Sequence, residues 1–92
     1  MSAIDISVIV PCYNEERYIT SLLDAIYTQT ITLERVEVII ADGLSSDQTR
    51  KKVSDFQENH PKLSVLLIDN PKRNIPSALN LAIRSAQGEY II

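Results

Sequence analysis

Three side chains in this sequence, an aromatic ring, an acid and an arginine, have the chemistry needed to hold a nucleotide. Tyr13 offers a flat face for a base, and Asp42 offers a carboxylate that accepts from a base imide or a ribose hydroxyl. Arg73 supplies a planar fork of donors. The three residues lie about 30 positions apart, the length of one strand-helix-strand unit. This spacing predicts that a repeating fold brings them together.

Glycine-rich phosphate loops are absent from the sequence. Gly43 and Gly88 are its only glycines, so neither the dinucleotide fingerprint Gly-x-Gly-x-x-Gly nor a Walker loop can be present. The segment that follows the first apolar run reads Pro-Cys-Tyr-Asn-Glu-Glu instead. A nucleotide bound here must therefore be held in another way.

Charge and cysteine content narrow the possible partners. The net charge is -3 and the basic residues are spread along the chain, so no basic stripe is available and nucleic acid is not an expected partner. Cys12 is the only cysteine, which excludes an internal disulfide and a Cys/His zinc site and favours a reducing compartment. No apolar run approaches the roughly 18 residues that cross a bilayer.

Short apolar runs separated by helical patterns predict an α/β fold. The runs are rich in β-branched residues, as in strands buried within a parallel sheet. Short connections favour parallel strands joined by right-handed crossovers. We expect one sheet of Rossmann-like βαβ units with strand order 3-2-1-4. The predicted strands are Ile6–Val10, Val36–Ala41, Leu63–Ile68 and Tyr90–Ile92.

The segments between these runs carry helix signals. Asn14 is expected to cap the first helix, residues 45–49 supply capping groups for the second, and Pro76 suits the first turn of the third. Gly88 is expected to end the third helix. The apolar positions that define the three patterns are Ile19, Leu22, Leu23 and Ile26, then Val53 and Phe56, then Leu79, Ala82, Ile83 and Ala86.

Ligands of such sheets bind outside the carboxyl ends of the strands, where the strand order reverses. The segments that reach this edge are Pro11–Glu16, Asp42–Asp47 and Asp69–Pro76. Each of them contains one of the three candidate side chains. The predicted fold therefore makes this edge the candidate nucleotide site.

Five blocks, in order, resemble the family 2 glycosyltransferases of GT-A fold, and within them the bacterial exopolysaccharide (succinoglycan-type) glucosyltransferases. The resemblance runs from Ile6 to Ile92. The sequence departs from the family at Gly43, where many relatives carry a second acid, and at Leu44, where they often have glycine. The blocks are residues 7–16, 39–49, 69–73, 78–80 and 86–91, which read SVIVPCYNEE, IIADGLSSDQT, DNPKR, ALN and AQGEYI.

The resemblance implies roles for five residues. Pro11, Tyr13 and Glu15 would line the base and ribose end of a nucleotide sugar. Asp42 would hydrogen-bond the base, and Arg73 would reach the base or the diphosphate. The function implied is that of an inverting glycosyltransferase. It would move a sugar from a nucleoside-diphosphate donor, with UDP expected, to a saccharide or lipid-linked acceptor in cell-surface polysaccharide biosynthesis.

The same resemblance predicts what these residues do not contain. Residues 1–92 would form the N-terminal, nucleotide-sugar-binding part of a single GT-A domain, ending before the family's Asp-x-Asp motif. The divalent metal, Mg²⁺ or Mn²⁺, and the catalytic base would then depend on later residues, so no catalytic residue or metal ligand is named here and no sugar transfer by this fragment is expected. The full-length enzyme would be cytoplasmic or at the inner face of the cell membrane, attached only through other segments.

Each candidate residue also has a purely structural interpretation. Tyr13 could pack at the start of a helix, and Asp42 could cap a turn after a strand. Glu15 could suit a first helical turn, and Arg73 could belong to a solvated loop. Structural roles alone are expected for Cys12 and Asp47, and no role is assigned to His60.

A second class of function fits part of the pattern. Receiver-type signalling modules are also parallel α/β sheets, with acids after the first strand and a phospho-acceptor aspartate, here Asp69, after the third. That function requires Asp69 to lie near Glu15 and Glu16 with a metal between them. It leaves Tyr13 and Asp42 without a role. A nucleotidyltransferase would need a glycine-rich basic loop after the first strand, which this sequence lacks.

Overall fold

A four-stranded parallel sheet forms the centre of the structure. The structure is a computed structural model and describes residues 4–30 and 32–92. All neighbouring strands are parallel and the order is β3-β2-β1-β4, so the predicted order 3-2-1-4 is confirmed. The crossovers bring the carboxyl ends of β1, β2 and β3 to one edge. The strands are β1 (Ile6–Cys12), β2 (Val36–Asp42), β3 (Ser64–Asp69) and β4 (Tyr90–Ile91).

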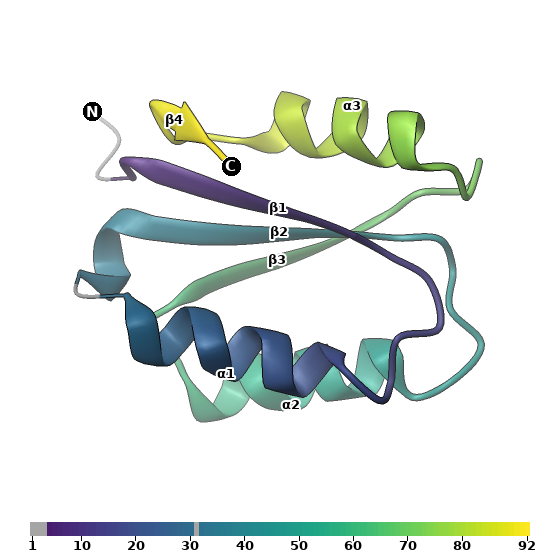
Figure 1. The fold of residues 1–92 in the computed structure, drawn as a ribbon, viewed down its shortest axis with the longest axis horizontal. Coiled ribbons are helices and arrows are strands. Elements are labelled where there is room, and N and C mark those ends of the chain that lie inside the picture. The colour runs from purple at the N-terminus through teal and green to yellow at the C-terminus, as the bar shows by residue number, and fades with distance from the viewer. Residues whose placement is uncertain (1–3, 31) are drawn as a thin grey trace.

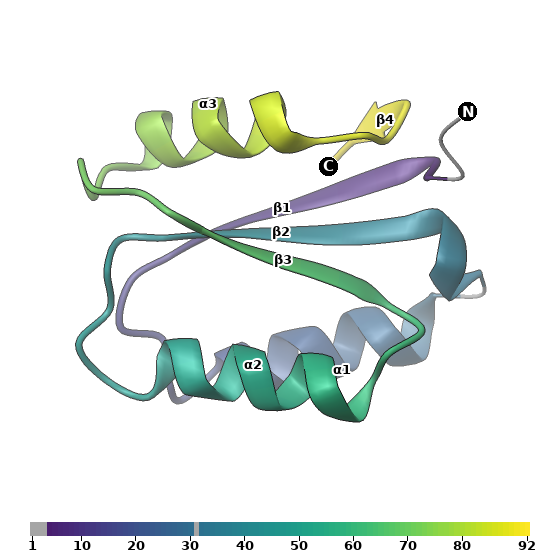
Figure 2. The same ribbon diagram turned by 180° about the vertical axis from the view of Figure 1, so that it is seen from behind.

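Helices cover both faces of the sheet. α1 (Ile19–Gln29) and α2 (Thr49–Asn59) lie side by side on one face, and α3 (Ile75–Ser85) lies on the other (Figure 1). The view from behind shows the same three layers, with β3 crossing in front of β2 and β1 (Figure 2). A short 3₁₀ helix, Leu33–Arg35, leads into β2. Among the described residues, no helix has the length and hydropathy required to cross a membrane.

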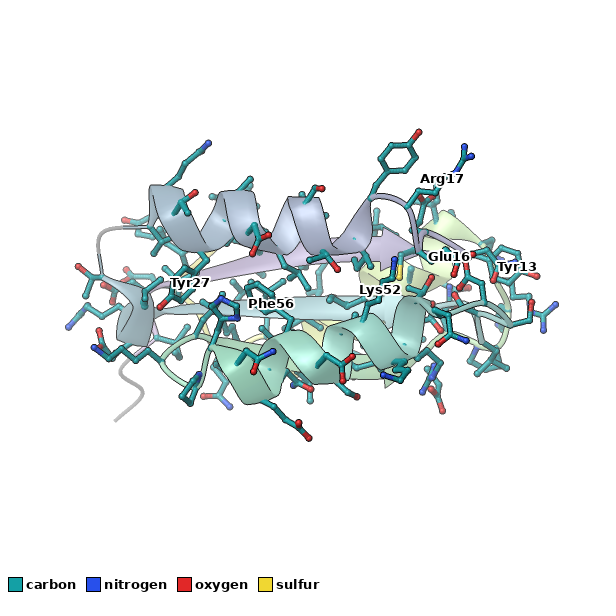
Figure 3. All side chains as sticks on the ribbon, turned by 90° about the horizontal axis from the view of Figure 1, so that it is seen from below. Tyr13, Glu16, Arg17, Tyr27, Lys52 and Phe56 are labelled. Carbon is teal, nitrogen blue, oxygen red and sulfur yellow. The ribbon has the colours of Figure 1, made fainter. Side chains whose placement is uncertain are left out.

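The main core lies between the sheet and the α1/α2 layer. All seven residues of β2 are buried, as expected for the central strand of a parallel sheet. Tyr27 of α1 and Phe56 of α2 lie at the junction of the two helices, far from the end that carries Tyr13 (Figure 3), and their rings meet edge to face. The buried core residues are Val10, Ile19, Leu23, Val36, Val38, Ile40, Val53, Phe56, Leu63 and Val65.

α3 approaches the sheet through small residues rather than large ones. Ala78 and Ala82 are buried, whereas Leu79 and Ile83, which helped to define the helical pattern, are exposed. The physical reason is that alanines at i and i+4 form a smooth stripe that allows a helix to pack closely against strands. Leu22 of α1 is likewise exposed, although Ile19 and Leu23 are buried as the pattern predicts.

Two predicted caps are wrong. α1 begins at Ile19, without a side-chain cap, because residues 13–18 first form a turn in which Asn14 bonds to another loop. α3 ends at Ser85, so Gly88 lies beyond its C-cap and instead packs against Ser7. In both cases the partner is distant in sequence, and local cap signals do not report it.

β1 continues through Pro11 to Cys12, two residues beyond its predicted end. The N–H of Ile9 donates to the carbonyl of Ile92 on the β4 side at 2.9 Å. Pro11, two residues further, faces the same side, past the point where β4 pairs with β1. Because β4 does not extend this far, the missing N–H of Pro11 costs no backbone hydrogen bond between the described strands.

Candidate functional site

Three loops meet at the carboxyl edge of the sheet, and each contains one residue in the left-handed region. Asn14 follows β1 with φ 50°, Leu44 follows β2 with φ 61°, and Arg73 follows β3 with φ 57°. Asparagine tolerates this conformation, but for leucine and arginine it costs roughly 1–2 kcal/mol. Such strain concentrates at functional sites, where the surrounding structure holds it in place.

Hydrogen bonds join the loop after β1 to the loop after β2. The Asn14 N–H donates to Ser45 Oγ at 2.8 Å, and Asn14 Oδ1 accepts from the Ser46 N–H at 2.9 Å. Asp47 accepts from the backbone N–H of Thr49 at 2.9 Å. Asp47 therefore has the predicted structural role beside the start of α2, which begins at Thr49, and hydrogen bonds join the two loops into one wall.

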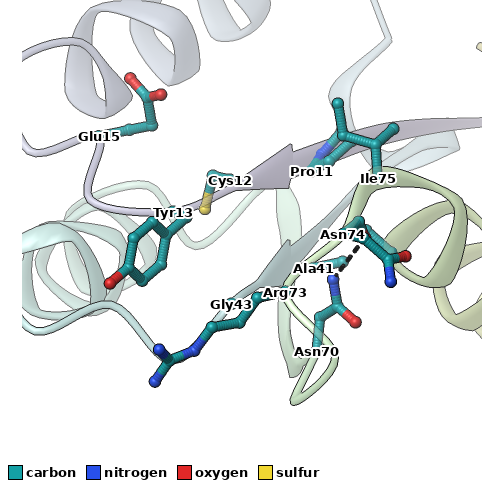
Figure 4. Close-up of a pocket in the computed structure, with 11 residues that line it drawn as sticks. Pro11, Cys12, Tyr13, Glu15, Ala41, Gly43, Asn70, Arg73, Asn74 and Ile75 are labelled. Atoms are coloured by element: carbon teal, nitrogen blue, oxygen red, sulfur yellow. Dashed lines mark hydrogen bonds between the residues drawn. The ribbon is translucent and has the colours of Figure 1, made fainter.

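A pocket of about 260 Å³ opens at this edge (Figure 4). Four of the five predicted site residues, Pro11, Tyr13, Glu15 and Arg73, line it. Tyr13 and Arg73 lie on one side, and the Glu15 carboxylate points away from Arg73 (Figure 4). The remaining lining residues are Cys12, Ala41, Gly43, Asn70, Asn74, Ile75 and Ala78.

Gly43 lies between Tyr13 and Arg73. A Cβ at this position would lie 3.3 Å from Tyr13 Cδ1 and 3.3 Å from Arg73 Cγ, so the absence of a side chain lets the three residues pack together. The Arg73 Cζ is 5.4 Å from the centroid of the Tyr13 ring, a cation-π arrangement. Gly43 does not have a positive φ, so it supplies space and not backbone freedom.

Asp42, the fifth predicted residue, lies beneath the pocket and not on its surface. Its side chain is fully buried. Its carboxylate accepts from the Ser45 N–H at 2.9 Å, the Ser45 hydroxyl at 2.5 Å and Arg50 Nη1 at 2.9 Å. Burial alone would raise the pKa of Asp42, but the bonds from Ser45 and Arg50 outweigh it and hold the pKa below its usual value. The carboxylate is charged and shapes the loop that carries Gly43.

Arg50, which sequence reasoning missed, joins the ends of two strands. Its Nη1 contacts Asp42 and its Nη2 contacts Asp69 at 2.8 Å. Asp42 and Asp69 are register partners on β2 and β3, so their carboxylates lie at the same level. The available signal was a pair of acids at the ends of two successive strands, with an arginine in the first turn of the helix that connects them.

Asn70 is a second residue that the sequence analysis missed. It is buried and lines the pocket. Its N–H donates to the Asp42 carbonyl at 2.7 Å, and its Nδ2 donates to the Asn74 carbonyl at 2.9 Å. Its Oδ1 is the one buried side-chain polar atom of the described residues without a hydrogen-bond partner. Asn70 therefore braces the loop that presents Arg73.

Cys12 has the structural role that was predicted. Its thiol donates to Asp42 Oδ1 at 3.3 Å. Burial, with the bond to Asp42 and its charge, raises the pKa of Cys12 to about 12, so the thiol stays protonated and is a poor nucleophile. His60 stacks on Phe56 with ring centroids 3.9 Å apart, far from the pocket.

A larger hollow elsewhere on the sheet does not compete with this pocket as a site. A hollow of about 500 Å³ lies at the amino edge of the sheet, but its main charged feature is an exposed ion pair between Asp5 and Arg35. The pocket at the carboxyl edge combines an aromatic face, a cation and polar groups, which is the usual character of a ligand site. Across residues 4–30 and 32–92, no three His, Cys, Asp or Glu side chains are grouped to hold a metal ion.

The sequence was also compared with known proteins. Residues 7–92 match the family described as Glycosyl transferase family 2. A glucuronosyltransferase of Methanococcus voltae, which acts on dolichyl N-acetyl-α-D-glucosaminyl phosphate, is 36% identical over 95% of this chain and 27% of its own. The succinoglycan biosynthesis protein ExoA of Rhizobium meliloti is 34% identical over 92% of this chain and 26% of its own. The chain thus spans about a quarter of the length of these relatives.

Solved structures agree with the sequence comparison. A mannosyltransferase of Pyrobaculum calidifontis, in complex with GDP-Man and Mn²⁺, matches 94% of this chain and 25% of its own with a TM-score of 0.87 and 39% identity. TarS of Staphylococcus aureus, residues 1–349 with UDP-GlcNAc, matches 97% of this chain and 25% of its own with a TM-score of 0.81 and 32% identity. The predicted family and its GT-A fold are confirmed, and the chain belongs to glycosyl transferase family 2.

Proposed function

We propose that residues 1–92 are the nucleotide-sugar-binding part of a single GT-A domain in an inverting glycosyltransferase. The donor is a nucleoside-diphosphate sugar, with UDP the carrier, and the acceptor is a saccharide or a lipid-linked saccharide of a cell-surface polysaccharide. Family membership and the relatives that bind UDP-GlcNAc or GDP-Man support the donor class. The succinoglycan protein and the dolichyl-linked relative support the acceptor class.

The pocket at the carboxyl edge is the observation that carries this proposal. Its volume of about 260 Å³ lies just below the range for whole small-molecule ligands and suits a base with its ribose. Tyr13 would stack on the base, and Pro11 and Glu15 would line the base and ribose end. Arg73, which lines the pocket beside Tyr13, would meet the diphosphate or the base edge.

Asp42 would contact the base only if its present hydrogen bonds changed. Its side chain is buried and both of its oxygens already accept hydrogen bonds. Contact with the base imide would require one of the bonds from Ser45 to be exchanged for a bond to the ligand. Without that exchange, Asp42 would act on the nucleotide only by holding the loop that places Gly43 in the pocket wall.

The chemistry of transfer would depend on residues other than these. In an inverting reaction, the acceptor hydroxyl oxygen forms a bond to the anomeric carbon as the bond to the diphosphate breaks, and a base takes the hydroxyl proton. The described residues offer no metal-binding cluster, so a divalent ion like the Mn²⁺ in the Pyrobaculum structure would be held elsewhere. We place the enzyme in the cytoplasm or at the inner membrane face.

The receiver-type alternative finds little support in the site. Asp69, its required phospho-acceptor, is paired with Arg50. The side chain of Glu16 accepts from the Gln48 N–H at 3.2 Å, which fixes it toward α2. Tyr13 and the pocket beside it would have no use in that function.

Calorimetric titration of this chain with UDP tests the proposal. Tyr13→Ala should weaken UDP binding by about tenfold, because stacking of a base on an aromatic ring contributes roughly 1–3 kcal/mol. Tyr18→Ala is the matched control, since Tyr18 is exposed and lies outside the pocket. Equal affinities for the two variants, or no binding of UDP or GDP by the unchanged chain, would refute the assignment.

A further inference from the structure

A buried polar cluster lies at the opposite end of the sheet from the pocket. Ser7 and Glu37 are almost fully buried. The Ser7 hydroxyl donates to Glu37 Oε2 at 2.6 Å, and the Gln87 N–H donates to the same oxygen at 2.6 Å. The Gly88 N–H donates to Ser7 Oγ at 2.8 Å. The cluster therefore ties two neighbouring strands to the segment that connects α3 with β4.

The burial of the Glu37 carboxyl group is compensated by these hydrogen bonds and not by an ion pair. None of the ion pairs found among residues 4–30 and 32–92 involves Glu37. A buried acid that loses its hydrogen-bond donors is strongly destabilised. Ser7 and Glu37 are register partners on adjacent parallel strands, so the hydroxyl and the carboxyl group meet on one face of the sheet. Glu37 also accepts from the Gln87 N–H, and Ser7 accepts from the Gly88 N–H.

Gly88 allows this contact because the backbone of β1 passes directly beside it. A Cβ on Gly88 would lie 2.6 Å from the Ser7 nitrogen and 2.6 Å from Ser7 Oγ, closer than side-chain carbons approach other atoms. Its φ is not positive, so the requirement is for space. The connecting segment is therefore clamped to the amino ends of β1 and β2.

The position of β4 depends on this clamp, by which we mean the hydrogen bonds from Gln87 and Gly88 to Glu37 and Ser7. β4 begins two residues after Gly88, and its Tyr90 and Ile91 are exposed, so burial contributes little to holding it. Its remaining attachment is a short ladder to β1, in which Tyr90 pairs with Ile6. A clamp two residues before a short edge strand determines which residue of β1 each residue of β4 meets.

We propose that Glu37 is a positioning residue that sets the register of β4 against β1. Because β4 is parallel to β1, its carboxyl end points toward the edge that carries the pocket. A shift of register would move that end by about 3.3 Å per residue and turn its side chains to the other face. Glu37 thus controls, from the far end of the sheet, where β4 arrives relative to the nucleotide pocket. This inference rests on the fold and stands apart from the donor assignment.

Amide hydrogen exchange of this chain, followed by NMR, tests the proposal with two variants. Glu37→Leu removes the acceptor. We expect exchange at Gln87, Gly88, Tyr90 and Ile92 to accelerate at least about tenfold relative to the amides of β2 and β3. Glu37→Gln retains an oxygen that can accept both bonds, and it should keep exchange at these four amides within about threefold of the unchanged chain.

Two results would overturn it. The first is uniform acceleration in all strands by Glu37→Leu, which would make Glu37 a contributor to global stability alone. The second is failure of Glu37→Gln to preserve the protection of β4. If Glu37→Leu does not fold, Ser7→Ala tests the two bonds of the connecting segment separately. It should expose the Gly88 amide, whose acceptor is lost, and leave the Gln87 amide protected by Glu37.

Discussion

The guanidinium carbon of Arg73 lies 5.4 Å from the centroid of the Tyr13 ring, and Gly43, which has no side chain, lies beside both residues. The ring that would stack on a base is therefore partly covered by the Arg73 guanidinium. A cation-π contact at an exposed site contributes roughly 0.5–1 kcal/mol, little enough for a ligand to displace. The same guanidinium would then be free to meet a phosphate.

This arrangement predicts that Arg73→Ala weakens the binding of UDP but not the binding of uridine. UDP affinity should fall by about tenfold or more, since a charge-assisted hydrogen bond contributes roughly 1.5–3 kcal/mol. Uridine affinity should stay the same or rise by up to about fivefold, because the Tyr13 face is uncovered. Calorimetry with both ligands gives the comparison, and Arg84→Ala on α3 is the control. Parallel losses for the two ligands would mean that Arg73 contacts the base alone.

Gly43→Ala should reduce nucleotide affinity with little loss of stability. The added Cβ would meet Tyr13 and Arg73 at 3.3 Å, and both contacts involve side-chain atoms that can shift slightly. We expect the melting temperature to change by only a few degrees, a cost of about 1 kcal/mol or less, and UDP affinity to fall severalfold. A variant with unchanged affinity would show that the space beside Gly43 is not used by the ligand.

Because of Asp42, the free energy of unfolding should decrease as the pH falls below about 4. Its pKa is lower in the folded chain than in the unfolded chain, so the unfolded state binds more protons in that range. The stabilisation is complete above the unfolded value of about 3.9 and is lost as the pH falls through the folded value. Asp42→Asn should cost about 1–3 kcal/mol at pH 7 and flatten the decline below about pH 4.

Thermal unfolding across this pH range measures the effect, with Asp24→Asn on the exposed surface of α1 as the control. Asp5 and Asp47 also have lowered pKa values, so some decline should persist in the Asp42 variant. Identical pH profiles for the unchanged chain and Asp42→Asn would contradict the interpretation of Asp42 as a charged, loop-shaping group.

Leu44→Gly should be tolerated or mildly stabilising. Leu44 has φ 61°, which costs a non-glycine residue roughly 1–2 kcal/mol, whereas glycine adds about 0.5–1 kcal/mol of unfolded-state entropy. The net expectation is a gain of up to about 1 kcal/mol in the free energy of unfolding. Leu22→Gly, in the middle of α1, should instead lose about 1 kcal/mol. Chemical denaturation of both variants provides the measurement, and a loss in Leu44→Gly as large as in Leu22→Gly would contradict this account.

The sheet and its order could be predicted because the signals for them are local. β-branched runs such as Val36–Ala41 identify buried strands, and short crossovers leave few topologies. The edge at which Tyr13 and Arg73 meet then follows from the parallel arrangement. For this reason the location of the pocket could be inferred before its geometry was known.

Features that depend on distant partners could not be predicted in the same way. Asn14 has the residue type of a helix cap, but its side chain bonds to a loop about 30 residues away. Asp42 has the residue type of a ligand contact, but its buried side chain accepts hydrogen bonds from Ser45 and Arg50. α3 packs through Ala78 because a small side chain permits close approach, which hydrophobicity alone does not indicate.

Nucleotide binding at the carboxyl edge is tested by adding UDP to the ¹⁵N-labelled chain and mapping the amide shifts by NMR. We expect the amides of Tyr13, Gly43 and Arg73 to shift in a saturable way. The amides of Asp5 and Arg35, at the opposite edge of the sheet, should not move. Shifts confined to that opposite edge, or no saturable shift at the carboxyl edge with either UDP or GDP, would contradict the claim that this edge binds the nucleotide.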